Sequence, residues 1–461
     1  MSIQNFPAAL QPIIQQGFLA RGFQEGLRSR LSFRSIADRM PIPNRVGETI
    51  TMTRRGLKAP VTTPLTPASN TNFDNGLTPS SFGVEQYTLT MNIFGDTIDL
   101  NTVTEQVGIA NLFVANARTN GVQATQSLDR LARDALYGGK NVFGLGGYLG
   151  GNTRVRTALS AAGTSVSVDD IRGFQNTLTT SGTVISIAGS AGMLVVVGSG
   201  TYTLLAAVAD GTNVSTAPGG ISGVLTFSTN VSTSDGAAGN AVIASTAPLI
   251  IRPNARATTA ALIASQGTYG SASYVPGDTM TLDTVNQAVA ALRMNNVPPV
   301  DESGLYHCYL DDQQLLGLFR DGDFKQLYRG AYNSETYRTG QVVEILGVRY
   351  IPTTEAPQQA SLGAGRIHRA IVVGQGALVE GDFVGMAATD AIPDAEKALI
   401  EMVDDVVMVT REPQDRLKQI IAQSWYWIGG YALPTDATAT PNIIPTATNS
   451  YLKRGVVIES L

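Results

Sequence analysis

The residues of this chain that could take part in acid–base or nucleophilic chemistry are few. The 461 residues include two histidines, His307 and His368, and one cysteine, Cys308. His307 directly precedes Cys308 in an apolar run that predicts a strand, so the two side chains would point to opposite faces. We therefore do not expect a cysteine–histidine catalytic pair from these neighbours. A single cysteine also excludes an internal disulfide framework and a cysteine-based metal cluster.

Neighbouring carboxylates could act as a general acid and base. Three acidic pairs occur, at Asp311/Asp312, Asp321/Asp323 and Asp404/Asp405. We interpret each pair as a helix cap, a turn or a solvated pair, because aspartate favours these backbone positions. The motifs HExxH, GxxxxGK[ST] and GxSxG and an EF-hand loop are all missing from the sequence. We predict no catalytic residue, no cofactor and no metal site.

The glycine-rich residues 138–151 need a separate explanation. They follow a helix pattern, whereas a dinucleotide-binding loop follows a strand. Gly144 and Gly146 are followed three residues later by Leu149, where that fingerprint has a third glycine. We interpret the stretch as a connector.

A long helix dominates the pattern, predicted over residues 103–137. Thr102 and Glu105 form a capping-box pattern before it, and glycines follow it from Gly138. Small or apolar residues share one face at steps of three and four: Val103, Val107, Ala110, Val114, Ala117, Gly121, Ala124, Leu128, Leu131 and Ala135. A coiled coil is the alternative, since the period is 3.5 residues. The small central residues instead favour a helix that lies close against a sheet.

The N-terminal part of the chain is basic and the remainder is acidic. Residues 1–58 carry an excess of six positive charges, which leaves the remainder with an excess of eleven negative ones in a chain of net charge −5. We expect this arm and the acidic body to attract each other, within or between copies. A solvated charge run is the alternative. DNA binding by the arm has no support from interleaved aromatic residues.

Two strands are predicted near residues 47–53 and 87–93, with almost thirty proline-interrupted residues between them. A loop of that length is unusual inside a compact domain, and an isolated two-stranded hairpin is marginal in water. Both difficulties disappear if the hairpin lies across a neighbouring copy. We infer an oligomerisation arm.

The composition and the predicted secondary structure change after the long helix. Residues 173–251 contain only two charged residues, Asp210 and Asp235, and short strand patterns between turns, which favours an inserted all-β module over a disordered linker. From residue 279 the pattern is mixed: a helix near 282–292, a strand at 305–310, and a short helix capped by Asp311 and Gln314. Further strands are predicted at 342–352, 371–373, 403–410 and 419–431.

This order of parts resembles the major capsid proteins of tailed bacteriophages, in particular podophage-type ones, whose fold is shared with encapsulins and the herpesvirus shell floor. The segments that carry the resemblance are residues 305–310 (LYHCYL), 319–330 (FRDGDFKQLYRG) and 347–357 (GVRYIPTTEAP) in the axial region, and 210–227 (DGTNVSTAPGGISGVLTF) in the inserted module.

The resemblance implies an α+β fold with six parts. They are an N-terminal arm (1–46), an extended loop (47–98), a peripheral domain with a long spine helix (99–160), an inserted β-rich module (161–258), an axial domain (259–400) and a return to the peripheral domain with a C-terminal tail (401–461). No long, charged, helical segment precedes the fold, so scaffolding would be separate or missing.

The function implied is a structural shell protein without enzymatic activity. Its copies would form hexamers and pentamers and close an icosahedral container around double-stranded DNA, which they would contact without sequence specificity. Cement or decoration, portal and scaffolding proteins would be further partners. The N-terminus does not resemble a signal peptide and no membrane span is predicted, so we expect assembly in the host cytoplasm and a place in the virion. An encapsulin-like compartment and, more distantly, a secreted β-rich adhesin are the alternatives, and an enzyme has the least support.

Overall fold

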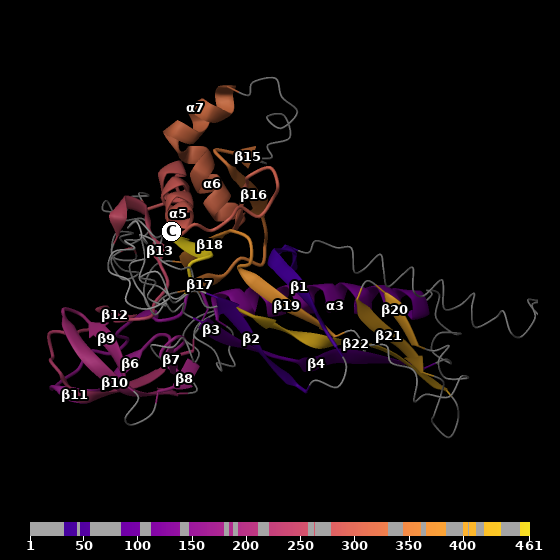
Figure 1. Cartoon of the computed structure of the whole chain (residues 1–461), viewed down its shortest axis with the longest axis horizontal. Coiled ribbons are helices and arrows are strands. Elements are labelled where there is room, and N and C mark those ends of the chain that lie inside the picture. Colours follow the sequence, from indigo (N-terminus) through magenta and orange to yellow (C-terminus); the bar gives the residue numbers. More distant parts are fainter. Residues whose placement is uncertain are drawn as a thin grey trace, which may run out of the picture. The chain divides into compact units, whose positions relative to one another are not determined.

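The computed structural model describes residues 32–43, 47–55, 84–101, 112–138, 147–178, 184–187, 192–210, 221–256, 262, 278–330, 344–360, 366–383, 400–403, 405–411, 419–434 and 452–461 (Figure 1). The chain forms two compact units. Unit 1 comprises Met1–Ile50, Thr88–Arg133 and Val379–Ala432, and unit 2 comprises Thr51–Tyr87, Asp134–Leu378 and Leu433–Leu461. The mixture of helices and strands confirms the predicted α+β class.

Unit 1 is built on a six-stranded sheet. Its order is β1 (Ala37–Ile42), β19 (Leu378–Phe383), β22 (Ile420–Ala432), β21 (Val406–Arg411) and β20 (Ile400–Val403), and β4 (Asn92–Asn101) pairs with β22. The prediction of one continuous strand at 403–410 is wrong, because β20 ends at Val403 and β21 begins at Val406, which pairs with Val403 across a tight turn. Asp405 adopts a φ of 68° there, a left-handed conformation that aspartate tolerates better than most residues.

The helix α3 (Leu112–Tyr137) packs on this sheet (Figure 1). Its residues Ala117, Ala124 and Leu128 are buried in one core cluster with Trp425 and Trp427 of β22. The small residues of the stripe thus face two indole rings, which confirms a helix laid on a sheet. Val103, Val107, Ala110 and the capping-box residues lie outside the described residues.

A glycine makes room for one of these rings. A Cβ atom on Gly429 would lie 2.3 Å from Cζ2 of Trp427, so only glycine fits beneath the indole. Phe94 and Tyr431 stack on the same ring, with centroids 6.0 and 5.6 Å away. Trp427 is therefore the centre of the unit 1 core.

The strands β2 (Thr49–Arg55) and β3 (Val84–Thr90) form a two-stranded sheet of their own. The predicted pairing of two hairpin strands is confirmed, but the second predicted strand, near 87–93, is divided at Met91, because Ile93 lies in β4 and pairs with Ile428. The proline-rich residues 56–83 lie outside the described residues. Among the strands that the structure describes, these two pair with no other.

The inserted module in unit 2 is a six-stranded sheet. Its order is β5 (Asn152–Arg154), β12 (Ala241–Ala244), β9 (Met193–Val197), β10 (Gly200–Ala209), β11 (Gly223–Val231) and β6 (Gly163–Val168), and a small pair, β7 (Asn176–Leu178) and β8 (Val184–Ser186), accompanies it. Fifteen buried hydrophobic residues form its core. The prediction of an inserted β-rich module is confirmed, and the alternative of a disordered linker is wrong. β5 begins within the predicted peripheral range 99–160, because Arg154 pairs with Ala241 of this sheet.

Both charged residues of this low-charge segment are hydrogen-bonded within the module, where Asp235 is buried and Asp210 is exposed. Asp235 accepts hydrogen bonds from the hydroxyls of Tyr202 (2.7 Å) and Ser199 (2.8 Å), which hold the pKa of its carboxyl well below the usual range. Asp210 accepts from Ser222 Oγ (2.7 Å) and pairs with Arg156 (2.5 Å). These carboxylates order turns of the module.

The second sheet of unit 2 has the order β13 (Ile250–Ile251), β23 (Gly455–Ser460), β18 (Arg366–Val373), β14 (Tyr306–Leu310), β16 (Val348–Pro352) and β15 (Glu344–Ile345), and β17 (Gln358–Ala360) pairs with β18. Helices α5 (Leu282–Met294), α6 (Asp312–Arg320) and α7 (Gly322–Gly330) accompany it, and two short 3-10 turns, η2 (Arg34–Ile36) and η4 (Pro253–Ala255), complete the described elements. The predicted capping box of Asp311 and Gln314 is confirmed.

Besides β5, further strands lie in sheets other than those expected from their place in the sequence. β13, from the range assigned to the inserted module (161–258), lies in the second sheet of unit 2. β23, from the range assigned to the peripheral return (401–461), pairs with β18 and β13 in the second sheet of unit 2. β19, from the range assigned to the axial domain (259–400), pairs with β22 in unit 1. An apolar run predicts that a strand forms, but its partner depends on where the chain crosses between sheets.

Candidate functional site

His307 and Cys308 point to opposite faces of β14, as the strand pattern predicts. Cys308 is fully buried in the hydrophobic core, where burial raises the pKa of its thiol far above the usual range. His307 lies on the other face, where its Nε2 is 3.0 Å from Oδ2 of Asp301. The thiol is inert in this environment, since only an accessible thiolate is a nucleophile.

The structure brings together a histidine–aspartate pair that the sequence does not reveal. Nδ1 of His368 on β18 contacts Oδ2 of Asp311, and His368 lies opposite Ser460 of β23. Such a set resembles part of a hydrolase triad. Here Oγ of Ser460 accepts from Nε2 of Gln314 (3.1 Å), Asp311 caps α6, and Ser460 is completely buried. The arrangement is a structural support of the sheet.

The other acidic pairs lie at a helix start and at a turn between strands. Asp321 accepts a hydrogen bond from the backbone N–H of Leu282 (2.8 Å) at the start of α5 and from that of Asp323 (3.3 Å). Asp405 occupies the β20–β21 turn. The predicted cap and turn roles are confirmed for these residues, and Asp404 lies outside the described ones.

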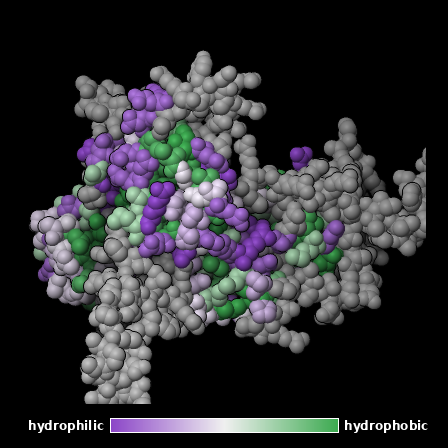
Figure 2. All heavy atoms as spheres, turned by 45° about the horizontal axis from the view of Figure 1, so that its top comes forward, coloured by the Kyte–Doolittle hydropathy of each residue, from purple (hydrophilic) through white to green (hydrophobic). Residues whose placement is uncertain are grey.

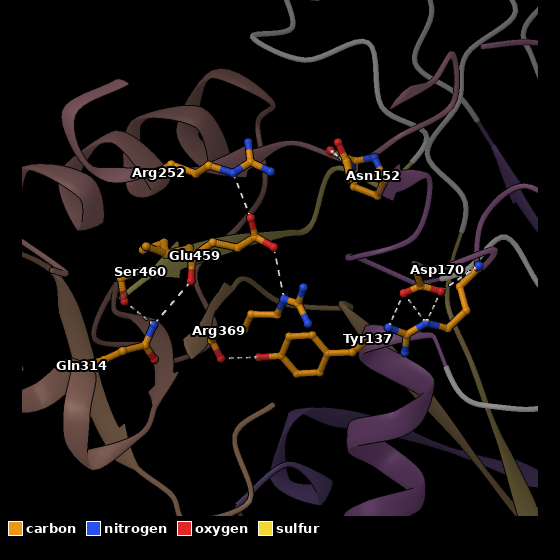
Figure 3. Close-up of polar contacts among 11 residues, drawn as sticks. Tyr137, Asn152, Asp170, Arg252, Gln314, Arg369, Glu459 and Ser460 are labelled. Atoms are coloured by element: carbon orange, nitrogen blue, oxygen red, sulfur yellow. Dashed lines mark hydrogen bonds and ion pairs between the residues drawn. The ribbon is translucent and has the colours of Figure 1, made fainter. Parts of the chain in front are cut away.

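A buried ion-pair triad crosses the middle of the second sheet of unit 2 (Figure 3). Glu459 of β23 accepts from Nε of Arg252 (2.8 Å) and from Nε of Arg369 (3.1 Å). All three residues are at most 7% exposed. Burial lowers the pKa of the Arg369 guanidinium, and the charge of Glu459 opposes that effect. One carboxylate thus bonds guanidinium groups from the strand β18 and from the residue after β13.

The last residues of α3, from Asp134 onward, belong to unit 2 and are held by contacts within that unit (Figure 3). Tyr137 donates its hydroxyl to the carbonyl of Arg369 (3.4 Å), and the backbone N–H of Tyr148 donates to the carbonyl of Leu136 (2.7 Å). Arg172, held by Asp170 at 2.6 Å, donates to the carbonyl of Gly138 (2.6 Å). A cation at this negative end of the helix is favourable. The inserted module therefore helps to cap the long helix.

Residues 32–42 form the root of the N-terminal arm, and we call this segment the arm root. Asp129 of α3 accepts hydrogen bonds through Oδ1 from three successive backbone N–H groups, those of Ser32 (3.0 Å), Phe33 (2.7 Å) and Arg34 (3.1 Å). Phe33 is completely buried. One helix carboxylate thereby fixes the point at which the arm meets unit 1.

Two arginines of the arm root form ion pairs with the sheet of unit 1. Arg34 bonds Glu380 through Nε (3.1 Å) and Nη2 (2.6 Å), and Arg39 contacts Asp405. Burial acts to lower the pKa of Arg34, but Glu380 outweighs it and the pKa is raised. The predicted attraction between basic arm and acidic body is confirmed for this pair of arginines.

Asp382, also on β19, is an additional carboxylate in this cluster. Burial, followed by the charges of Asp405 and Glu380, raises the pKa of Asp382. A raised pKa in the folded state contributes stability at low pH that is lost as the pH rises through the folded value. We expect Asp382→Asn to stabilise unit 1 at neutral pH by roughly 0.5 kcal/mol, since solvent screens a partly exposed group.

Urea titrations monitored by tryptophan fluorescence measure this effect, because both tryptophans of the chain lie in unit 1. The difference between Asp382→Asn and the parent chain should shrink as the pH falls below the ordinary aspartate pKa. An equal difference at neutral and acidic pH would contradict the assignment.

The described surface of the chain mixes polar and apolar residues. Figure 2 shows hydrophilic and hydrophobic residues interspersed over the described part of one face. Within the described ranges, no group of three or more metal-ligating side chains occurs and no helix is long and apolar enough to cross a membrane. The exposed large hydrophobics include Ile93, Val208 and Leu194.

No protein-family model matches the chain, and no curated protein matches it. The chain is similar to three solved capsid structures: that of cyanophage P-SCSP1u (10% identity, TM-score 0.47, covering 94% of this chain and 89% of that one), that of Helicobacter pylori bacteriophage KHP30 (9%, 0.46, 94% and 91%) and that of Ralstonia phage GP4 (12%, 0.48, 94% and 92%). All three are bacteriophage capsids, the class that the sequence resembles. The contacts within the chain itself, rather than these similarities, support the function that we propose.

Proposed function

We propose that this chain is a major capsid protein of a tailed bacteriophage, a structural shell component rather than an enzyme. Copies assemble into hexamers and pentamers and close an icosahedral shell around double-stranded DNA. The observation that carries the proposal is the hairpin of β2 and β3, which pairs with none of the three large sheets of the described chain.

The hairpin needs a covering partner. Of the hairpin residues whose burial the structure describes, Leu89 alone is buried, and it lies against Gly381 of β19. Two strands that bury so little apolar surface are marginal in water, because the burial does not offset their ordering. The sequence places 28 further residues between Arg55 and Val84, including Pro60, Pro64 and Pro67. A second copy that lies beneath the hairpin supplies the missing contact area.

The rest of the chain supports the same proposal. α3 stiffens unit 1, and the arm root starts from a fixed anchor on α3 and β19. Obligate interfaces typically bury about 2,000–5,000 Å², and a projecting arm and hairpin are a direct way to reach such areas. The acidic remainder of the chain limits attraction to packaged DNA, because phosphate binding depends on cationic contacts.

The partners and place of assembly follow as parts of the proposal. Other copies of the chain are the main partner, with a portal, separate scaffolding and cement or decoration proteins as further ones. The DNA is contacted without sequence specificity. Assembly takes place in the host cytoplasm, and the product is the virion shell.

Replacement of residues 56–83 by a two-residue Asn-Gly turn tests the proposal. We expect the variant to keep the circular dichroism and tryptophan fluorescence of the parent chain, because the three large cores of the described chain lie elsewhere. Sedimentation and negative-stain imaging should show closed shells for the parent chain and only small oligomers for the variant.

A matched control shortens residues 211–220, between β10 and β11, to the same turn and should still give shells. A parent chain that stays monomeric under all assembly conditions, or a hairpin variant that forms normal shells, would overturn the proposal.

A further inference from the structure

Two glycines lie directly opposite each other on neighbouring strands of the unit 1 sheet. Gly381 of β19 pairs with Gly430 of β22. A glycine inside a strand is destabilising relative to alanine, and it often marks a place where another backbone approaches closely. The pair therefore indicates that a segment of chain lies against this point of the sheet.

The segment that lies there consists of residues 89–91, at the end of β3. A Cβ atom on Gly430 would lie 2.0 Å from the carbonyl oxygen of Thr90 and 3.6 Å from Cα of Met91. A Cβ atom on Gly381 would lie 2.6 Å from Cδ2 of Leu89. The chain thus lies over β22 and then over β19, in contact with both glycines.

These contacts belong to the lower end of the hairpin, residues 48–50 and 88–91 of unit 1, which we call the hairpin base. β4 and β19 flank β22 on opposite sides, because Gly429 pairs with Asn92 of β4 and with Asp382 of β19. The pairing of β4 with β22 begins at Asn92 and does not include the residues before it. The hairpin base therefore reaches the β19 side of the sheet by crossing β22, and its contacts with the two glycines fix its place there.

Leu89 supplies the buried side chain of the hairpin base. It is 0% exposed, whereas its neighbours Thr88 and Thr90 are exposed. The Cβ atom that Gly381 lacks would also lie 2.6 Å from Cδ1 of Ile42 on β1, which is buried as well. Leu89 and Ile42 thus fill the space that a side chain on β19 would occupy.

The crossing lies on the face of the sheet that is turned away from α3. Gly429 faces the indole ring of Trp427, which is buried in the core cluster with α3. Successive residues of a strand point to opposite faces, so Gly430 faces the other side. A side chain added at Gly430 would therefore disturb the hairpin base and not the tryptophan core.

We propose that Gly430, with Gly381 beside it, is a positioning residue for the hairpin. Because it has no side chain, residues 89–91 cross the sheet in backbone contact, and this contact fixes where the hairpin leaves unit 1. The role of this position in assembly rests on the proposed function, since a hairpin that lies across a neighbouring copy must leave its own copy at a defined place.

A fluorophore on the hairpin base reports whether the base lies on the sheet. The single natural cysteine, Cys308, is fully buried, whereas Thr88 is exposed. The full-length Thr88→Cys chain can therefore be labelled at one accessible thiol and studied before assembly. We expect high anisotropy of the label, with the fluorescence of Trp425 and Trp427 as a separate measure of the unit 1 core.

Gly430→Ala in the labelled chain is the decisive variant. Its methyl group would meet the backbone carbonyl of Thr90, which cannot move aside unless the whole segment moves. We expect the equilibrium to shift toward a displaced hairpin base by roughly tenfold or more. The anisotropy of the label should fall while the tryptophan fluorescence stays unchanged.

Gly381→Ala should lower the anisotropy less, because the atoms that its methyl group meets are the ends of flexible side chains. Ile42→Val removes one of those atoms, Cδ1, and should restore part of the anisotropy of Gly381→Ala but none of that of Gly430→Ala. Gly163→Ala on β6 is the matched control, since its Cβ would lie 3.8 Å from the nearest atom. It should leave the anisotropy unchanged.

Two results would overturn the positioning role: anisotropy in Gly430→Ala equal to that of the parent, or a loss that occurs only together with a change in tryptophan fluorescence. In sedimentation, Gly430→Ala should form few or no closed shells, and a normal yield of shells would overturn the role as well. The anisotropy is measured on unassembled chains. A parent chain that forms no shells would contradict the proposed function and leave the crossing at Gly430 intact.

Discussion

Glu459→Gln should destabilise unit 2 by about 3–5 kcal/mol. Glutamine keeps the size of the side chain but removes the one negative charge between Arg252 and Arg369. Both guanidinium groups would remain at most 7% exposed while the charge of Glu459 is lost. Because whole domains are stable by only about 5–15 kcal/mol, the loss is a large fraction of the total.

Urea unfolding with two probes measures this effect. The circular dichroism transition should move to lower urea, whereas the fluorescence of the two tryptophans reports unit 1 and should not move with it. Glu344→Gln, which removes a solvent-exposed partner of Arg349, serves as the control and should cause no measurable change.

A charge-free triad provides the complementary measurement. Replacement of Arg252 and Arg369 by methionine together with Glu459 by leucine should recover most of the lost stability, because apolar groups of similar volume do not need a counter-ion. Equal transitions for Glu459→Gln and the parent chain would show that the triad does not contribute to stability.

Trp427→Ala should destabilise unit 1 by about 3–5 kcal/mol. The indole ring is completely buried between α3, Phe94 and Tyr431, and its removal leaves a cavity that the rigid sheet beneath Gly429 cannot fill. The cost combines the lost transfer of the ring from water with the lost contacts of its neighbours.

The remaining tryptophan, Trp425, reports the unfolding of this variant. Ile93→Ala on β4 is the control, since Ile93 is 72% exposed and its truncation should change stability by no more than about 0.5 kcal/mol. A Trp427→Ala variant as stable as the Ile93→Ala variant would contradict the assignment of Trp427 to the centre of the core.

Local patterns predicted much of the fold because local physics decides them. The periodicity of Ala117, Ala124 and Leu128 predicted a helix that packs closely on a sheet, and the Asp311–Gln314 spacing predicted a helix start. The strand spacing around His307 and Cys308 predicted opposite faces and no catalytic pair. Each of these inferences depends on residues a few positions apart.

Contacts between distant residues were beyond the reach of such patterns. Nothing in the sequence pairs Asp129 with residues 32–34, or Glu459 with Arg252 and Arg369. A charged residue in a strand is normally solvated, and only the position of β23 between two other strands makes Glu459 a buried counter-ion.

The amino-acid sequence by itself determined the kinds of element, the long helix with its small-residue face, the charge difference between arm and body, and the scarcity of catalytic groups. The tertiary structure alone decided that β23 joins the second sheet of unit 2, that β19 joins unit 1, and that the arm root is anchored by Asp129 and Glu380. The reason is that secondary structure follows short-range sterics and hydrophobic periodicity, whereas strand partners and buried ion pairs follow from how the whole chain satisfies its apolar and charged groups at once.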